Sequence, residues 1–561
     1  MKKILVLIGT IAAVLAAGIY YYIALPAINI HSVDFWWFII SILAVIFVWR
    51  LLKGNARNFR TEGQQIYVDK FQLTLSAKVM GAVLALAIGV FFVGTLLGSP
   101  IINASKYQKL LNVQKGNFSE DVAQADYDTI PLLDKASASL LGDRKMGSMV
   151  EFVSQFEAAS DYTQINFQGK PVRVTPLEYA STIKWLTNQS DGIPAYIMID
   201  MTTQETECVM LEEGIKYSKS EYFNRYIYRH LRFNYPTYIF SDQIFFEIDE
   251  EGTPYWICPV KKFNIGLFGG ETVGRVIMVN AITGECVDYE VAEVPTWVDK
   301  VYSAELLMQL YDYSGIYVNG FLNSVLSQRG CLQSTNGYNY IAMDDDVWVY
   351  TGVTSLNADQ SNVGFVLMNQ RTMETRYYEV EGAIEDSAMS SAQGQVQHLN
   401  YQATFPLLLN IADEPTYFMA LKDQAGLVKM YAMVNVQKYQ VVATGDTIKE
   451  CEQKYREILL ENGIIDEEES KIETELPEVI VPENEIKTVT GTILEIYPLI
   501  VDGDSSLYIK LEEGEAAEYL YWINLTEGLN IIALDYQVGD SMTVSFEGTE
   551  EIIRKVLEIS E

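Results

Sequence analysis

Cysteine and histidine are scarce in this chain of 561 residues, which contains five cysteines and three histidines. An odd, scattered set of cysteines without a C-x-x-C pair indicates neither a disulfide framework nor a zinc site, so we expect buried free thiols. The histidines are equally far apart, and no two have the H-x-x-x-H spacing that could hold a catalytic metal. The cysteines are Cys208, Cys258, Cys286, Cys331 and Cys451.

Basic residues are also in short supply, because 40 Lys and Arg stand against 74 Asp and Glu, a formal net charge of −34. The first hundred residues hold eight basic and three acidic side chains, so the acidic excess belongs to the remainder. A strongly acidic globular part repels phosphate backbones. The composition therefore argues against nucleic acid as a partner.

Motifs for catalysis are missing as well. The sequence contains no G-x-S-x-G or H-E-x-x-H pattern. The glycine-rich stretch 266–274 precedes neither a helical pattern nor a G-K-[S/T] sequence, so we interpret it as a long hairpin loop rather than a phosphate cradle. No catalytic residue and no cofactor follows from the sequence, which favours a non-enzymatic role and leaves an enzyme open.

What the chain has in abundance is apolar residues near its start. Segments 4–25, 35–52 and 79–98 are almost free of charge, and each is long enough, at about 1.5 Å per residue, to cross a hydrocarbon layer of about 30 Å. The sequence thus predicts three transmembrane helices in a membrane domain over 1–102. The first segment also fits a cleaved signal peptide, since Lys2 and Lys3 precede it and "AVLAAG" is a possible cleavage site.

Lys and Arg residues around these segments predict the orientation. Lys2 and Lys3 precede the first segment, and the short loop 26–34 carries no basic residue. The positive-inside rule then places the amino terminus and the 53–78 loop in the cytoplasm and everything after about Ser99 outside the cell. We expect a multi-pass plasma-membrane protein whose later residues are extracytoplasmic. The basic residues at or in the second loop are Arg50, Lys53, Arg57, Arg60, Lys70 and Lys78.

The extracytoplasmic part reads as a mixture of helices and hairpins. After a helical connector over 103–160, short apolar runs are separated by turn residues, and an Asp or Asn ends the first run of each hairpin. Helical patterns precede at least three of these strand groups, so the fold class is α+β, with units over 161–300 and 301–462. The turn residues are Asp200, Asn280, Asn369 and Asn435, and the helical patterns span 175–189, with Thr175 as N-cap, 218–233 and 386–399.

One hairpin carries a resemblance to a known family. "EGTPYWICPV" followed by "GRVIMVNAITGECVDYEV" resembles the PepSY domain, a small helix-on-sheet module of bacterial envelope proteins. The similarity is clearest over 218–291 and looser at 192–211 and 415–445. It implies tandem antiparallel helix-on-sheet units and an envelope location, and it supplies no catalytic residue. The whole chain also resembles membrane-anchored envelope proteins of Gram-positive bacteria.

The carboxyl end forms a separate region. Dense acidic residues and two prolines predict a linker over 463–486. Five strand-like runs over 487–561 then resemble a small all-β, OB-like barrel. Many such barrels bind single-stranded nucleic acid through basic grooves, which the acidic composition argues against here.

Two clusters of charged residues are candidate sites. Asp344, Asp345 and Asp346 lie in a predicted turn and offer oxygen ligands for Ca²⁺, unless the turn is simply solvated. Arg225 and Arg229 are spaced i, i+4 on a predicted helix and suit a carboxylate or phosphate, unless they pair with nearby acidic residues.

Aromatic side chains, including 36 tyrosines, fall on or beside many expected strands. Such rings either pack across strands or present a face that binds glycans or peptides, and both interpretations stay open. These residues include Tyr235, Tyr238, Tyr255, Trp256, Tyr338, Tyr340 and Trp348.

The leading hypothesis is a membrane-anchored extracytoplasmic binding or scaffold protein of the bacterial cell envelope. It would present its α+β domains to a protein or a cell-wall polymer. Two alternatives remain: a regulator or inhibitor of a secreted peptidase or wall enzyme, which the PepSY resemblance implies, and an enzyme that acts on cell-wall polymers through carboxylates.

Overall fold

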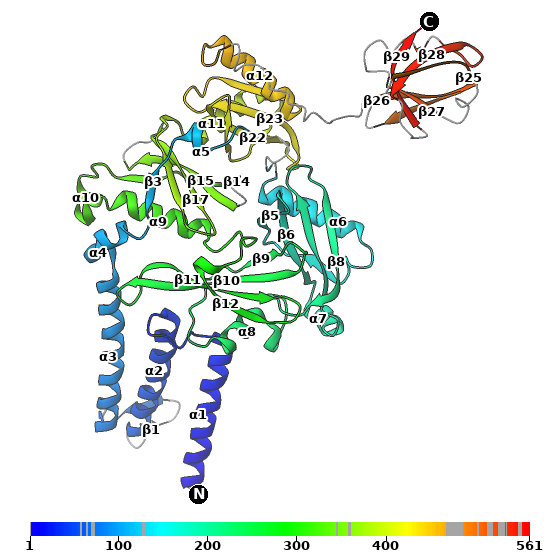
Figure 1. Ribbon diagram of the computed structural model, residues 1–561. Helices are drawn as coiled ribbons and strands as arrows, with labels where there is room; N and C mark the ends of the chain where they lie inside the picture. Colours follow the sequence, from blue (N-terminus) through cyan, green and yellow to red (C-terminus); the bar gives the residue numbers. More distant parts are fainter. Residues whose placement is uncertain are drawn as a thin grey trace. The chain divides into compact units, whose positions relative to one another are not determined.

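The computed structural model describes residues 2–55, 59–62, 65–68, 73–125, 131, 133–343, 346–356, 361–466, 486–501, 504–512, 520–524, 533–534, 536–547 and 553–560. It divides into two compact units, residues 1–471 and 472–561, each described by itself below (Figure 1). Most of the segment 463–486, which the sequence predicts to be an acidic linker, lies outside the described residues.

Three helices begin the chain, and among the residues described with side chains two helices are long and apolar enough to cross a bilayer. These are Val33–Gly54 and Leu75–Gly98, whereas the apolar part of the first helix that is described with side chains is the shorter Ile11–Ala24. The prediction of three transmembrane helices is therefore wrong. The elements are α1 (Lys2–Ala24), α2 (Val33–Asn55), β1 (Phe59–Glu62), β2 (Gln65–Val68) and α3 (Leu75–Gly98).

Four sheets of the described residues form the body of the first unit, and their strand pairs are antiparallel except β18–β3 (Figure 1). The first sheet has the order β4-β6-β7-β8, with β5 also on β6, and is accompanied by two helices. The second has the order β12-β11-β10-β9. The elements of the first are α6 (Lys135–Ser148), β4 (Phe156–Ala158), β5 (Thr163–Phe167), β6 (Lys170–Tyr179), α7 (Thr182–Asn188), β7 (Ile193–Asp200) and β8 (Thr206–Ile215). Those of the second are η1 (Phe223–Arg225), α8 (Ile227–Asn234), β9 (Phe245–Ile248), β10 (Pro254–Ile265), β11 (Gly269–Asn280), β12 (Cys286–Glu290) and η2 (Val291–Glu293).

The third and fourth sheets follow along the chain. The third has the order β13-β15-β17-β18-β3, with β14 on β15, and the fourth the order β20-β22-β23-β24, with β21 on β22. The elements of the third are α9 (Ala304–Ile316), α10 (Gly320–Leu326), β13 (Leu332–Ser334), β14 (Asn339–Met343), β15 (Asp346–Ser355), β17 (Gly364–Asn369) and β18 (Thr375–Tyr378). Those of the fourth are α11 (Glu385–Gln395), η3 (Gln397–Leu399), β20 (Gln402–Ala403), β21 (Leu407–Ile411), β22 (Glu414–Lys422), β23 (Val428–Asn435), β24 (Val442–Gly445) and α12 (Ile448–Glu461), while β16 (Ser361–Asn362) pairs with β19 (Gly382–Ala383).

Part of the connector region joins these later sheets. Strand β3 lies parallel to β18, although more than 250 residues separate them. Phe118 and Val122 are buried in the core between the third and fourth sheets. The elements of this region are α4 (Pro100–Gln108), β3 (Val113–Lys115) and α5 (Phe118–Asp121).

The four sheets stack through shared cores. On β10, Trp256 and Cys258 belong to the core shared with the first sheet, whereas Ile257 between them belongs to the core shared with the third. On β11, Ile277 and Met278 divide in the same way. Because successive side chains of a strand point to opposite faces, a strand buried on both faces becomes a nearly continuous apolar run. This burial on both faces explains why the β10–β11 hairpin is so apolar.

Three hairpins share one type of turn. Asn280 Oδ1 accepts the backbone N–H groups of Ile282 (3.0 Å) and Thr283 (2.9 Å), and Gly284 has a φ of 77°. Glycine adopts this angle without steric cost, whereas the equivalent positions in the other two turns carry side chains. Those turns begin at Asp200 and Asn369 and place Gln204 (φ 63°) and Met373 (φ 67°) at the equivalent position.

The body is hydrogen-bonded to one end of the helix group. The carboxyl ends of α1 and α3 and the α1–α2 loop all contact the second sheet or the segments around it, while the loop between α2 and α3 lies at the other end (Figure 1). The contacts are Arg232 Nε to Leu25 O (2.9 Å), Leu267 O to His31 Nδ1 (2.7 Å) and Tyr107 Oη to Gly98 O (2.7 Å).

The second unit is a closed five-stranded barrel with the order β25-β26-β27-β29-β28, in which β28 returns to β25. All pairs are antiparallel except β27–β29. Its core contains Ile493, Leu511 and Val544. The resemblance to OB-like barrels stays a prediction. The strands are β25 (Ile486–Val501), β26 (Asp504–Glu512), β27 (Leu520–Asn524), β28 (Ser541–Glu547) and β29 (Ile553–Ser560).

A central cavity as the candidate functional site

A cavity of about 670 Å³ lies among the first three sheets of the first unit. Its walls come from β6, β9, β10, β14 and the segment that leads into α9. This volume is within the range of small-molecule sites, which are typically lined by apolar and aromatic side chains. The aromatic residues of the wall are Tyr162, Tyr228, Phe245, Phe246, Trp256, Tyr338, Tyr340 and Phe405.

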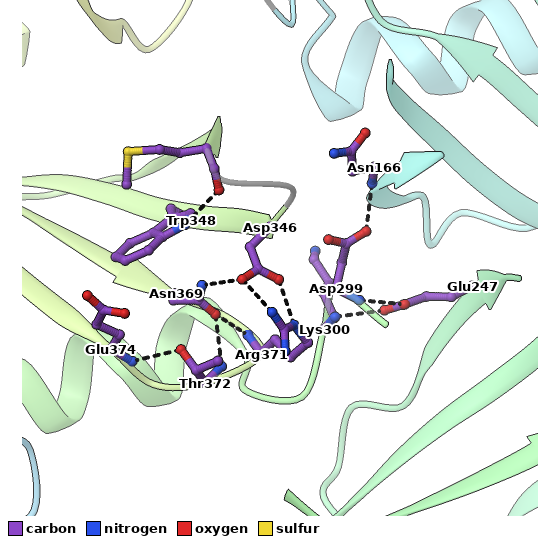
Figure 2. A network of polar contacts seen from close by, with 11 residues as sticks. Asn166, Glu247, Asp299, Lys300, Asp346, Trp348, Asn369, Arg371, Thr372 and Glu374 are labelled. Carbon is purple, nitrogen blue, oxygen red and sulfur yellow. Dashed lines mark hydrogen bonds and ion pairs between the residues drawn. The ribbon is translucent and has the colours of Figure 1, made fainter. Parts of the chain in front are cut away.

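The segment 299–302 is fixed at the junction of these sheets (Figure 2). Glu247 on β9 accepts the backbone N–H groups of Asp299 (3.0 Å) and Lys300 (2.9 Å). The carboxylate of Asp299 in turn accepts the N–H of Asn166 on β5 (2.6 Å). Two sheets therefore determine where the Lys300 side chain begins.

The third sheet holds the same segment through the turn between β17 and β18. The carbonyl of Gln370 accepts the N–H groups of residues 301 (3.0 Å) and 302 (2.8 Å). Asp346 fixes this turn, because its carboxylate binds Arg371 at 2.6 and 2.7 Å and Asn369 at 2.8 Å (Figure 2). Asp346 thus stabilises the turn that positions the cavity wall.

These contacts bear on the predicted calcium site. Asp346 is 5% exposed and both of its oxygens already have partners in Arg371 and Asn369. Asp344 and Asp345 lie outside the described residues. Within the part of the chain that is described, no group of three or more His, Cys, Asp or Glu side chains could hold a metal ion.

Lys300 lines the cavity and is 6% exposed. Its ammonium nitrogen is 4.5 Å from the ring centroid of Tyr340 and 5.7 Å from that of Phe245. Among the described residues, none places a carboxylate oxygen within 4.0 Å of this nitrogen. Burial lowers the pKa of Lys300 to about 8, and the nearby charge of Arg173 acts in the same direction, while Glu247 opposes it.

Glu247 lies behind this segment and is fully buried. Burial raises the pKa of its carboxyl to about 8, although the N–H groups of Asp299 and the charge of Lys300 act in the opposite direction. Both members of this pair are therefore shifted toward their neutral forms.

Arg173 is the second buried cation of the cavity wall and is 4% exposed. Val172 and Val174 on either side of it belong to the core of the first sheet, so the pleat directs Arg173 away from that core. Its Nε donates to Leu133 O (3.1 Å) and its Nη2 to Gln164 Oε1 (3.4 Å). No carboxylate oxygen of the described residues lies within 4.0 Å of it, and burial lowers its pKa.

Most carboxylates at the cavity wall already have partners. Asp161 lies 3.1 Å from Lys219 and 3.5 Å from Lys135, and these two cations outweigh burial, which acts upward, so that the pKa of Asp161 is lowered. Glu178 differs, because burial and the neighbouring carboxylates raise its pKa. The other pairs are Asp134 with Lys422, Asp242 with Lys261 and Glu305 with Tyr338.

The predicted anion-binding pair, Arg225 and Arg229, is not brought together on one helix. Arg225 belongs to η1 and Arg229 to α8, and Tyr226 between them has an extended backbone (φ −61°, ψ 115°). Arg225 Nη1 donates to Gln189 O (2.5 Å), while Arg229 Nη1 donates to Phe223 O (2.6 Å).

Arg229 instead contacts the end of α1. Its guanidinium carbon is 4.1 Å from the ring centroid of Tyr22, and its Nε donates to the Tyr22 carbonyl (3.4 Å). Basic side chains commonly bind the unpaired carbonyls at a helix carboxyl terminus. This arginine therefore helps to hold the body on α1.

Sequence reasoning missed Arg173 and Lys300. The available signal for Arg173 was a lone arginine between two valines in an apolar run, which a water-facing strand position explains equally well. The sequence around Lys300 contains no pattern that would have indicated a site. Three of the aromatic residues that the sequence did single out, Trp256, Tyr338 and Tyr340, line the cavity.

No protein-family model and no curated protein matches this chain. Two variants of an apocarotenoid oxygenase from Synechocystis are similar over 71% and 72% of this chain, at 7% and 8% identity and TM-scores of 0.13 and 0.14. The chain spans 60% and 62% of those oxygenase chains. A mutant levansucrase from B. megaterium is similar over 81% of this chain and 98% of its own, at 8% identity and a TM-score of 0.17. Scores this low carry no argument about fold or function.

Proposed function

We propose that this chain is a membrane-anchored binding protein of the bacterial cell envelope, with α2 and α3 in the membrane and the four-sheet body outside the cell. Arg50, Lys53 and Lys78 lie at the ends of α2 and α3 that are remote from the body. The positive-inside rule assigns those ends to the cytoplasm. The opposite helix ends are hydrogen-bonded to the body, which supports a fixed position of the body at the outer surface.

The observation that carries the binding role is the preformed cavity. Its wall is held by hydrogen bonds from three sheets, so the site is formed before any ligand arrives. Concave sites of about this volume with aromatic residues in the wall favour small ligands over flat protein surfaces. A fragment of a cell-wall polymer or another small envelope molecule fits this description. The PepSY-like and OB-like resemblances remain predictions beside this proposal.

The location is tested with protease-cleavable epitope tags in the full-length protein. One tag follows Glu561 and a second is placed in the loop between α2 and α3. In intact cells we expect external protease to remove the first tag and to reach the second only after lysis. Cleavage of the loop tag in intact cells, with protection of the terminal tag, would overturn the proposed orientation.

A second candidate function is hydrolysis of a wall glycan. One observation favours it: Glu178 and Asp161 both line the cavity, and their pKa values are shifted in opposite directions. A carboxyl with a raised pKa near one with a lowered pKa is typical of a general acid and its partner in glycosidases.

This candidate predicts release of soluble glycan from purified wall polymer by the full-length protein. Glu178→Gln would abolish the release, whereas the same substitution at Glu212, an exposed residue of β8 outside the cavity, would leave it unchanged. Absence of release by the unaltered protein would contradict the enzymatic role and leave the binding role in place.

A further inference from the structure

Two buried cations share the central cavity, and neither has a carboxylate among the described residues within 4.0 Å. Burial of an unpaired ammonium or guanidinium is costly, since the lost hydration is returned only by an opposite charge or by hydrogen bonds. Both side chains line the same cavity, and the charge of Arg173 lowers the pKa of Lys300. The wall therefore concentrates positive charge at one place in an otherwise acidic molecule.

The described residues leave most hydrogen-bond donors of these two groups without an acceptor. A guanidinium has five N–H donors, and Arg173 uses Nε and Nη2 on Leu133 and Gln164. An ammonium has three donors, and the Lys300 ammonium lies against the rings of Tyr340 and Phe245. A ligand oxygen anion between them would accept from both groups at once.

We propose that Arg173 and Lys300 bind the carboxylate of a small organic ligand in the central cavity. This inference rests on the proposed binding function and names the chemical class of its ligand.

The rest of the wall narrows that class. Carboxylates surround the remainder of the cavity, including Glu178, Asp161 and Glu305. These groups repel a second negative charge on the ligand and accept hydrogen bonds from hydroxyl or ammonium groups. A singly charged sugar acid or amino acid suits this arrangement better than a doubly charged phosphate. Tyr340 and Trp256 supply apolar faces for its carbon skeleton.

The test uses the detergent-solubilised full-length protein and its melting temperature. Sodium acetate is titrated against sodium chloride at constant ionic strength as the minimal carboxylate probe. Galacturonate and its neutral analogue galactose form a matched pair, and inorganic phosphate is the competing anion. We expect acetate and, at lower concentration, galacturonate to raise the melting temperature, and galactose to leave it unchanged.

Variants locate the effect. Arg173→Met and Lys300→Met should each weaken acetate binding at least tenfold, whereas Arg225→Met, which removes a basic residue bound to a backbone carbonyl, should leave it unaltered. Lys300→Arg keeps the charge and should retain binding. It should also remove the loss of affinity that we expect for the unaltered protein above pH 8, because Lys300, with a pKa of about 8, is then deprotonated. A purely structural lysine would not move this pH profile.

Equal stabilisation by acetate and chloride, or binding that survives both methionine variants, would overturn the proposal. Phosphate binding without carboxylate binding would overturn the assigned ligand class. This test and the test of orientation can fail independently. If the protein binds acetate but its carboxyl end is cytoplasmic, only the proposed orientation is refuted. An outward body that ignores carboxylates refutes only this inference.

Discussion

Arg232 and Lys300 are both buried basic residues with no carboxylate of the described residues within 4.0 Å, yet their surroundings differ. Arg232 on α8 donates to the backbone carbonyls of Leu25 and Tyr238, at 2.9 and 2.5 Å, with longer contacts to two more carbonyls. Among the described residues, the Lys300 ammonium instead lies against the rings of Tyr340 and Phe245. Carbonyl groups at the carboxyl end of a helix carry partial negative charge, so they stabilise a buried cation without any ligand. Burial of a basic residue alone therefore does not indicate an anion site, whereas burial together with unused hydrogen-bond donors at a cavity does.

The largest expected effect comes from removal of the satisfied cation. Arg232→Met leaves the carbonyls of Leu25 and Tyr238 unpaired in a buried place, so the free energy of unfolding should fall by about 3 kcal/mol. Thermal or chemical unfolding in detergent measures this loss, with Arg144→Met, an exposed arginine of α6, as the control. A change as small as that of the control would mean that the body is not held on α1 through Arg232.

Removal of the unsatisfied cation should have the opposite sign. Lys300→Met replaces a buried charge by an apolar side chain of similar length, so the ligand-free protein should gain about 2 kcal/mol. Lys300→Arg keeps the charge and should give no gain. The same unfolding measurement, without carboxylates in the buffer, decides the sign. Destabilisation by Lys300→Met would indicate that the ammonium has a stabilising partner.

The dependence of stability on pH should also distinguish Lys300 from Arg232. The ordinary pKa of lysine is 10.5, and burial lowers that of Lys300 to about 8. Between these values the unfolded chain holds a proton that the folded protein has lost, so stability rises with pH in this window. The contribution of Lys300 to this slope should be about 1 kcal/mol per pH unit between pH 8 and 9 and should be missing in Lys300→Met, while Glu247, with a pKa raised to about 8, contributes with the opposite sign. A slope that persists in the variant would have to come from another group.

Local structure was predictable from the sequence where residues close in the chain determine it. Asn280 and Gly284 belong to the turn that their spacing indicates, because an Asx side chain and a glycine at positive φ act within a few residues. The helix predicted over 175–189 fails for the complementary reason. Its first half is strand β6, in which Thr175 is buried and donates to Ala159 O, and the helix starts only after Ser181, which caps α7.

Candidate sites were harder to predict, because they depend on contacts between distant parts of the chain. Arg225 and Arg229 looked like a pair only on the assumption of a continuous helix, which Tyr226 interrupts. Arg173 and Lys300 line one cavity because Glu247 and Asn166 fix the 299–302 segment against two sheets. No periodicity in the sequence records these long-range hydrogen bonds.

The smallest effect is expected for Lys135, a basic residue at the mouth of the cavity rather than inside it. Lys135 also lines the cavity, but its side chain is 61% exposed and pairs with Asp161 at 3.5 Å. Since exposed ion pairs contribute little, Lys135→Met should change the free energy of unfolding by no more than about 0.5 kcal/mol. Acetate affinity should change less than threefold, because water already solvates this ammonium. A loss as large as that in Lys300→Met would place the bound carboxylate at the mouth, among exposed charges, and would remove the distinction between the two buried cations and the rest.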